Sequence, residues 1–198
     1  MRLLIATQNE GKVRGFRYAL TGIAPFVELL SAKDAGLTEF PPETGSSYIQ
    51  NATLKAVYAA EQTGLPSLGD DSGLEVEALD GAPGLYSARF GGELSNDERL
   101  AYLLNKLKDV PDETRNARFV CALALAMPEG ERRTFWGECR GEITRSATGV
   151  SGFGYDPVFY SHDLHKTFAE ASEAEKERVS HRGRAVAQLG KWLNSKKD

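Results

Sequence analysis

The fold class is decided by the stretch Leu3-Leu4-Ile5-Ala6-Thr7-Gln8-Asn9-Glu10-Gly11-Lys12-Val13. Residues 3–6 are a short apolar run, which predicts a buried strand. After the polar loop of residues 7–11, Val13, Phe16 and Leu20 recur at helical spacing and predict a helix over Lys12–Leu20. A buried strand followed by a loop and an amphipathic helix indicates an α/β fold.

Further helices are marked by their first residues. Ser47 with Gln50, and Ser95 with Glu98, have the spacing of capping boxes. Ile49 and the alanines at 52, 56 and 59 or 60 are expected to form the buried stripe of the first of these helices. A last helix is expected from about Ser180, packing through residues 186, 189 and 193.

Strand patterns fill the remaining segments. Leu65–Leu68 leads into a strand that we expect to end at Asp70 or Asp71, and Leu74–Glu77 alternates apolar and polar residues. Phe119–Ala126 is apolar throughout, as in a central strand covered on both faces, and Arg132–Ile143 is expected to return beside it as a hairpin. The sequence therefore predicts a mixed sheet, parallel early in the chain and antiparallel later.

Composition narrows the class of protein. The chain has 198 residues, enough for one domain or for two lobes that share a sheet, and a net charge of −4, which disfavours nucleic-acid binding through the overall field. No apolar run has the length of a membrane helix, so we expect a cytoplasmic protein that binds no membrane. Cys121 and Cys139 match no zinc spacing and are expected to be reduced.

Two adjacent carboxylates, in Asp70-Asp71-Ser72-Gly73, have two interpretations. Neighbouring residues of a strand point to opposite faces, so one carboxylate at a strand end can face a ligand, and Mg²⁺ takes carboxylate and phosphate oxygens together. Asp, Ser and Gly also form turns, so the run alone is equally consistent with a turn.

Three other segments carry candidate binding residues. The loop at residues 7–12 stands where open α/β sheets bind phosphates, although it is neither a Walker A loop nor a GxGxxG motif. The glycine-rich segment 149–157 carries Phe153, which can stack on a base or simply reach the core. His181 and Arg182 fall at a helix N-terminus, where the dipole disfavours cations, so a bound anion or keto oxygen is one explanation and a solvated turn the other.

Combined, these segments supply the groups of a nucleotide site. They contain the acids Glu43 and Asp71, the cations Lys12, Lys55, Lys176 and Arg182, and the aromatic ring of Phe153. The rigid loop Pro41-Pro42-Glu43 places its acid near the N-terminus of the helix that carries Lys55.

Seven motifs follow one another along nearly the whole chain: Ala6–Lys12, Glu43-Thr44-Gly45, Asn51–Ala56, Asp70–Leu74, Gly81–Arg89, Gly152–Pro157 and Ser180-His181-Arg182-Gly183. In this order they resemble the inosine triphosphate pyrophosphatase family. The resemblance implies one domain over residues 1–198, with an elongated two-lobed α/β fold around a long mixed sheet and the active-site cleft between the lobes. It also implies a homodimer that uses Mg²⁺ to hydrolyse ITP, dITP and XTP to the monophosphate and pyrophosphate.

The resemblance also implies roles for individual residues. Asp71 would be the general base and, with Glu43, a metal ligand. The substrate would be bound by Thr7, Gln8, Asn9, Glu10, Gly11, Lys12, Lys55, Ser72, Phe153, Gly154, Tyr155, Asp156, Lys176, His181 and Arg182. Residues 7–12 and Lys55 would hold the phosphates, and the last residues would lie near the base.

Two alternatives remain at this point. One is a related pyrophosphatase for other non-standard nucleotides, of the septum-inhibitor type, which would prefer dTTP, UTP or modified pyrimidines. The other is a regulatory module that binds a nucleotide without cleaving it. The Ser180-His181-Arg182 segment favours the purine enzyme over the first, and the full set of acids and cations favours an enzyme over the second.

Overall fold

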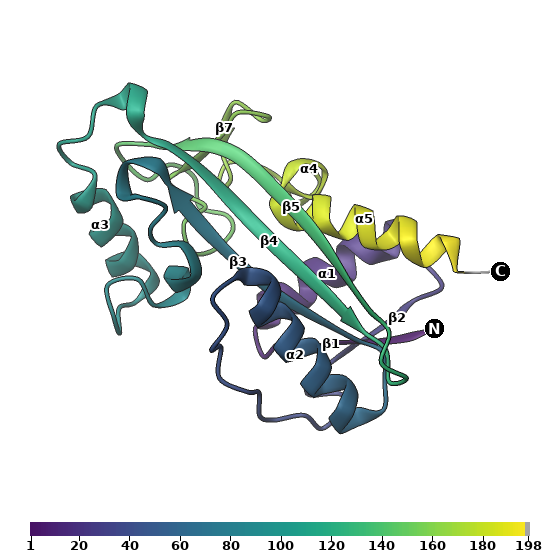
Figure 1. Ribbon diagram of the computed structural model, residues 1–198. Coiled ribbons are helices and arrows are strands. Elements are labelled where there is room, and N and C mark those ends of the chain that lie inside the picture. The colour runs from purple at the N-terminus through teal and green to yellow at the C-terminus, as the bar shows by residue number, and fades with distance from the viewer. Residues whose placement is uncertain (197–198) are drawn as a thin grey trace. The chain divides into compact units, whose positions relative to one another are not determined.

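A sheet of seven strands organises the computed structural model, which describes residues 1–196 (Figure 1). The strands are β1 (Arg2–Ile5), β2 (Glu28–Ser31), β3 (Ser67–Val76), β4 (Asn116–Ala126), β5 (Arg132–Ile143), β6 (Phe159–Ser161) and β7 (Lys166–Thr167). Their order is β2-β1-β3-β4-β5-β6-β7. β1 pairs in parallel with β2 and β3, whereas β6 pairs antiparallel with β5 and β7. The predicted mixed α/β fold is confirmed.

The chain divides into two compact units. Unit 1 is Met1–Asp71, Cys121–Gly137 and Gly183–Asp198, and unit 2 is Ser72–Val120 and Glu138–Arg182. Residues 197 and 198 of the predicted single domain lie outside the described residues. The single domain, the elongated shape and the cleft between lobes stay predictions.

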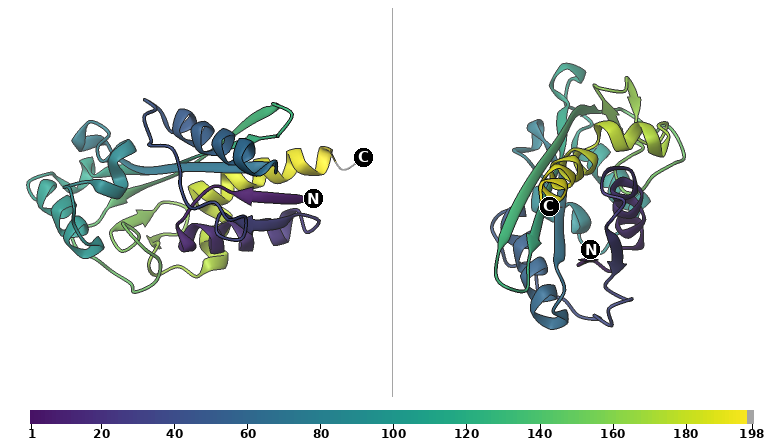
Figure 2. Two further views of the ribbon diagram at one scale, coloured as in Figure 1. Left: turned by 90° about the horizontal axis from the view of Figure 1, so that it is seen from below. Right: turned by 90° about the vertical axis from the view of Figure 1, so that its right-hand side faces the viewer.

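Unit 1 packs helices on both faces of its strands. Leu3 and Ile5 of β1 point into a core with α1 (Glu10–Ile23) and α5 (His181–Ser195). Leu4 points to the opposite face, where it packs with Ala59 of α2 (Tyr48–Thr63). Figure 2 shows α1 and α2 on opposite sides of β1. This alternation follows from the two-residue period of a strand.

Both early helices begin with a side-chain cap. Asn9 accepts a hydrogen bond from Lys12 N, so α1 starts at Glu10, two residues before the predicted start. Ser47 caps α2 as predicted, but Gln50 Oε1 accepts from Ser46 rather than from Ser47. The predicted stripe of α2 is wrong at Ile49, which is 42% exposed, because Tyr48 lies one turn before Ala52 and is the buried residue.

Unit 2 has its own core between the sheet and α3 (Asn96–Lys106). The predicted capping box of Ser95 and Glu98 is complete, and Leu100, Leu103 and Leu107 are buried. The short elements of this unit are η1 (Glu77–Leu79), η2 (Gly84–Arg89), η3 (Asp112–Thr114) and α4 (Glu173–Val179). The predicted last helix is α5, and Val186, Leu189 and Leu193 are buried as expected.

The strand β3 corrects one prediction. It runs from Ser67 to Val76 without a break, so the acidic run is neither a turn nor a strand end. The carboxylate of Asp70 accepts from Lys12 Nζ, and that of Asp71 accepts from Asn51 Nδ2. Because both carboxylates bond to side chains of other elements, they do not compete with the backbone hydrogen bonds of the strand.

Cys121 and Cys139 are both buried and are not joined by a disulfide. Cys121 lies in the core of unit 1 and Cys139 in that of unit 2. Within residues 1–196, no helix is long and apolar enough to cross a membrane.

Candidate active site

The loop after β1 is arranged around the N-terminus of α1. Thr7 Oγ1 accepts a hydrogen bond from Asn9 N at 3.2 Å, and Asn9 Oδ1 accepts from Lys12 N at 3.1 Å. Gln8 Nε2 donates to Thr38 O at 2.5 Å. The first amides of a helix carry partial positive charge, so this loop offers donors suited to an anion.

Lys12 is paired with a buried acid. Its Nζ lies 2.8 Å from Oδ1 and 3.1 Å from Oδ2 of Asp70, whose side chain is only 1% exposed. The Lys12 side chain is 20% exposed. The cation therefore keeps access to solvent while a buried carboxylate fixes its position.

Two residues of α2 contact the acids of unit 1. Asn51 Nδ2 donates to Asp71 Oδ2 at 3.0 Å, and Lys55 Nζ donates to Glu43 Oε1 at 2.7 Å. Asn51 and Lys55 are four residues apart and so lie on one face of the helix. Both acids that are predicted to bind the metal, Glu43 and Asp71, therefore contact side chains on this face, and one of those side chains is the cation Lys55.

The Asp71 carboxyl is held above its ordinary pKa. Burial is the largest cause, and the nearby carboxylates of Glu43 and Asp70 add to it. Lys55 and the hydrogen bond from Asn51 act in the opposite direction and only partly offset the rise. A raised carboxyl pKa suits a group that must accept a proton near neutral pH.

The pKa of Lys55 is also shifted, in the direction that keeps this side chain protonated. Burial acts to lower its pKa, but the charge of Asp70, the hydrogen bond to Glu43 and the charge of Asp71 outweigh burial and raise it. Three carboxylates thus share the field of this one ammonium group, and an additional cation would be favourable among them.

The donor set fits Mg²⁺ bound together with a substrate. Within residues 1–196, no group of three or more His, Cys, Asp or Glu side chains is arranged to hold a metal ion. Mg²⁺ is usually held by one or two carboxylates, with substrate phosphates and waters as the other ligands. Glu43 and Asp71 supply two such carboxylates, and their mutual repulsion raises the pKa of Asp71.

A second cluster, in unit 2, surrounds Asp156. Its Oδ2 accepts a hydrogen bond from Phe153 N at 3.1 Å and lies 3.5 Å from Lys176 Nζ. Burial raises the pKa of Asp156, and Lys176 only partly offsets this. Gly152 has φ +83°, and a Cβ there would lie 2.1 Å from Asp156 Oδ2, so the loop requires glycine.

Aromatic rings in the same unit present flat surfaces. Phe153 is 49% exposed, and the guanidinium carbon of Arg182 lies 6.0 Å from its ring centre. His181 is buried and stacks on Phe119 with ring centres 4.8 Å apart. An exposed ring beside a cation can stack on a nucleobase.

Tyr155 is fixed within unit 2. Its hydroxyl donates to Ser87 O at 2.9 Å, and burial raises its pKa to about 12. Ser87 Oγ in turn accepts from Leu74 N and donates to Gly84 O. Tyr155 thereby ties the glycine-rich loop to η2 and β3.

The predicted site residues divide cleanly between the two units. The residues predicted to hold phosphate and metal, Thr7–Lys12, Glu43, Lys55 and Asp71, all belong to unit 1. Those predicted near the rest of the nucleotide belong to unit 2: Ser72, Phe153, Gly154, Tyr155, Asp156, Lys176, His181 and Arg182. Within unit 1, Lys55 contacts Glu43; within unit 2, Asp156 contacts Phe153 and Lys176, and Arg182 lies over the ring of Phe153.

Sequence reasoning assigned no role to Asn51 and left Asp70 undefined. The available signal was the four-residue spacing between Asn51 and Lys55, which places both on one helix face. No pattern in the sequence indicated that Lys12 would bond to Asp70, 58 positions later.

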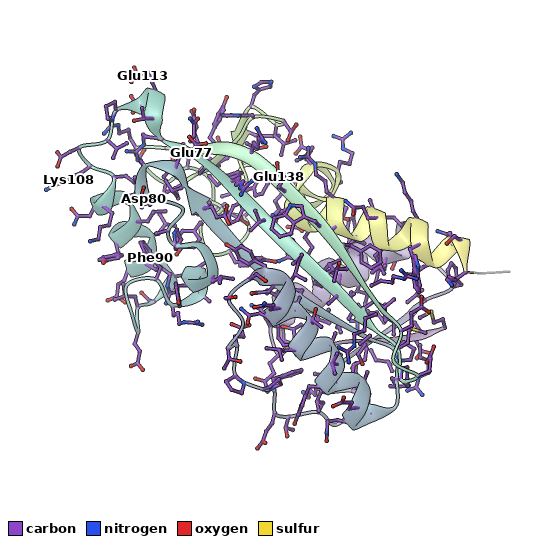
Figure 3. The ribbon with its side chains drawn as sticks, viewed as in Figure 1. Glu77, Asp80, Phe90, Lys108, Glu113 and Glu138 are labelled. Atoms are coloured by element: carbon purple, nitrogen blue, oxygen red, sulfur yellow. The ribbon has the colours of Figure 1, made fainter. Side chains whose placement is uncertain are left out.

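A pocket of about 460 Å³ in unit 2 contains none of the predicted site residues. It is lined by Glu75, Glu77, Gly81, Asn116, Ala117, Arg118, Arg140, Gly141 and His162. Arg118 is paired with Glu75 at 2.8 Å and with Glu138 at 3.1 Å. Figure 3 labels Glu77 and Glu138 on this part of the chain. Because Arg118 is paired with Glu75 and Glu138, and Arg140 with Glu138, both arginines of the pocket are already engaged by acids and are poorly suited to bind a phosphorylated ligand.

Fold and site together define an α/β protein with clustered acids and lysines suited to a phosphorylated ligand and a divalent cation. The model of the Ham1 family matches residues 3–192, and the chain belongs to that family.

Relatives of similar length support this assignment. A dITP/XTP pyrophosphatase of Thermus thermophilus is 47% identical over 190 residues, covering 96% of this chain and 90% of the relative. One from Halalkalibacterium halodurans is 46% identical and covers 96% and 98%. The solved structure of the Staphylococcus aureus Ham1 protein superposes with a TM-score of 0.88 at 38% identity and covers 100% of both chains. A nucleoside-triphosphatase / dITP/XTP pyrophosphatase from Mycobacterium abscessus has a TM-score of 0.76 at 44% identity, covering 96% and 98%.

Proposed function

We propose that this chain hydrolyses the non-standard purine nucleotides ITP, dITP and XTP to the monophosphate and pyrophosphate, with Mg²⁺ as cofactor. The observation that carries the proposal is the cluster of Asp71, Glu43 and Lys55 around one face of α2. The names of the relatives indicate the substrate class, and this cluster supplies acids and a cation suited to phosphate chemistry.

Asp71 is proposed as the general base. Its raised pKa and its neighbouring carboxylates favour acceptance of a proton from an attacking water. Glu43 and Asp71 would hold Mg²⁺, which supplies Lewis acidity and neutralises phosphate oxygens when bound.

The lysines and the α1 amides are proposed to bind the phosphates. Lys12 is held by Asp70, and Lys55 by Glu43, so neither cation needs to be ordered when substrate arrives. Fixed donors of this kind stabilise the charge that develops on oxygen in the transition state without further reorganisation.

Base selection is proposed to lie in unit 2. Phe153 would stack on the purine, and donors from His181 or Arg182 would bond to its 6-oxo group. Adenine presents an amino group at that position, so a donor aimed there would be left unpaired, which is costly in a buried site. We further propose that the enzyme is a cytoplasmic homodimer that acts on free nucleotides rather than on nucleic acid.

Product analysis tests the proposed reaction. The purified chain is incubated with ITP and Mg²⁺, and phosphorus NMR identifies the products. IMP and pyrophosphate in equal amounts are expected. IDP and orthophosphate would contradict a pyrophosphatase, and intact ITP would favour a binding module.

A further inference from the structure

Asn51 occupies an unusual position on α2. It is a polar residue that is only 3% exposed, and its side chain bonds to two different segments. Nδ2 donates to Asp71 Oδ2 at 3.0 Å, and Oδ1 accepts from Gly45 N at 2.8 Å. One amide thus joins the strand that carries Asp71 to the loop that carries Glu43.

The two partners fix which way the amide points. A carboxylate can only accept and a backbone N–H can only donate, so Asn51 must present a donor to Asp71 and an acceptor to Gly45. A rotated amide would place oxygen against the carboxylate and NH₂ against the N–H. Aspartate at position 51 would lose the donor, and leucine would lose both bonds.

Glycines bring both segments against the helix at this level. A Cβ at Gly45 would lie 2.6 Å from Asn51 Oδ1, and a Cβ at Gly69 would lie 2.0 Å from Ala52 O. These distances leave no room for a side chain, so the close approach of loop and strand depends on the two glycines. The position of Asn51 is therefore set by the surrounding backbone rather than by a flexible contact.

We propose that Asn51 is a positioning residue that aligns the Asp71 carboxylate with the loop bearing Glu43, and so builds the metal-binding pair. This inference rests on the proposed roles of Asp71 and Glu43. Partners that orient metal ligands typically change metal affinity or activity by about 10- to 100-fold when removed. The same effect is expected here.

The test compares Asn51→Leu with Gln62→Leu, a matched amide-to-leucine change at an exposed position of the same helix. kcat and KM for ITP, and Mn²⁺ affinity of the metal-free protein by calorimetry, are measured for each. Asn51→Leu is expected to lower kcat and Mn²⁺ affinity by about 10- to 100-fold and to change KM by less than about 3-fold. Gln62→Leu is expected to match the wild type. Unchanged kcat and Mn²⁺ affinity in Asn51→Leu would overturn the proposal.

A double variant separates positioning from a general loss of structure. In the Asp71→Asn background, Asn51→Leu is expected to have little further effect on kcat, because its action passes through Asp71. A full additional loss would assign Asn51 a merely structural role and refute the inference. Wild-type turnover of Asp71→Asn alone would instead refute the proposed base, so the two failures are distinguishable.

If Asn51→Leu does not fold, Asn51→Asp replaces it. Asp keeps the size of the side chain and the acceptor for Gly45 N, but it replaces the donor to Asp71 with a carboxylate oxygen and so adds a negative charge beside Asp71. A folded Asn51→Asp protein with wild-type kcat would overturn the proposal, and a kcat lowered about 10- to 100-fold supports it.

Discussion

Lys12 Nζ lies 2.8 Å from Oδ1 of Asp70, a carboxylate whose side chain is 1% exposed. The two adjacent acids of β3 therefore have different partners. Asp70 accepts from Lys12 of α1, and Asp71 accepts from Asn51 of α2. Breaking such a pair from one side leaves a buried charge without its partner.

The effects of substituting Lys12 and Asp70 on the free energy of unfolding are expected to be coupled. Lys12→Met should lower the free energy of unfolding by about 1–3 kcal/mol, less than for a fully buried pair because Lys12 is partly exposed. The Lys12→Met/Asp70→Asn double variant should recover much of this loss. Urea unfolding of the two single variants and the double variant measures the coupling, and strictly additive losses would show that the two side chains act independently.

Asp71→Asn is expected to raise stability while it lowers activity. The pKa of Asp71 is raised in the folded chain, so ionising this carboxyl costs more free energy in the folded than in the unfolded chain. The neutral amide should therefore raise the free energy of unfolding at pH 7 by about 0.5–2 kcal/mol, while kcat falls by about 10²- to 10⁴-fold. Denaturant unfolding and ITP turnover check both parts. A less stable variant would contradict the assigned cost of the buried charge.

The same pKa gives a stability trend with pH. A carboxyl whose folded pKa is raised binds its proton more tightly in the folded state, so its unfavourable contribution is present above the folded pKa and disappears as pH falls through it. The stability difference between Asp71→Asn and the wild type should therefore shrink as pH falls from 7 toward 4. Chemical unfolding across that range tests the trend, which would be wrong if the difference stayed constant.

Tyr155→Phe should act on stability rather than chemistry. Removing the hydroxyl leaves Ser87 O without that donor, and a cost of about 1–3 kcal/mol is expected. Because burial raises the pKa of Tyr155 to about 12, its hydroxyl should stay protonated until the pH approaches that value. Thermal unfolding and ultraviolet titration of the wild type and the variant measure these two effects. An ionisation well below pH 12 that is lost in Tyr155→Phe would contradict the burial of Tyr155.

Phe153→Ala is expected to weaken substrate binding with little effect on stability. The ring is 49% exposed, so truncation leaves no large cavity. Stacking of a base on an aromatic ring contributes about 1–3 kcal/mol, so KM for ITP should rise by about 5- to 100-fold. Steady-state kinetics and a melting curve check this, and an unchanged KM would remove Phe153 from the base site.

Local patterns predicted much of the fold. The caps at Ser47 and Ser95, the apolar run at 119–126 and the stripe of α5 were recognised because each is set by residues close in sequence. The acidic run was misjudged because a turn propensity was overridden by partners on other elements. Neither Lys12 nor Asn51 is near the run in sequence, so no local pattern could reveal them.

The roles of the candidate site residues came from the family resemblance and stay predictions, and the structure shows only particular contacts among them, such as Lys55–Glu43 and Lys176–Asp156. The pairing of Lys12 with Asp70 and the bridge made by Asn51 could not be predicted. Both depend on how β3 packs against α1 and α2, and that packing is fixed by close approaches at positions such as Gly69. A lone glycine in a sequence does not indicate which backbone will approach it.

Selectivity for the base is the most direct test of the proposed function. kcat/KM is measured for ITP, dITP, XTP, ATP, GTP and dTTP, each with Mg²⁺ and with EDTA. We expect kcat/KM for ITP, dITP and XTP to be at least about 100-fold above that for ATP, because a site built to bond an oxo group meets an amino group in adenine. No turnover is expected in EDTA. Equal values for ITP and ATP, or a preference for dTTP, would contradict the proposed function.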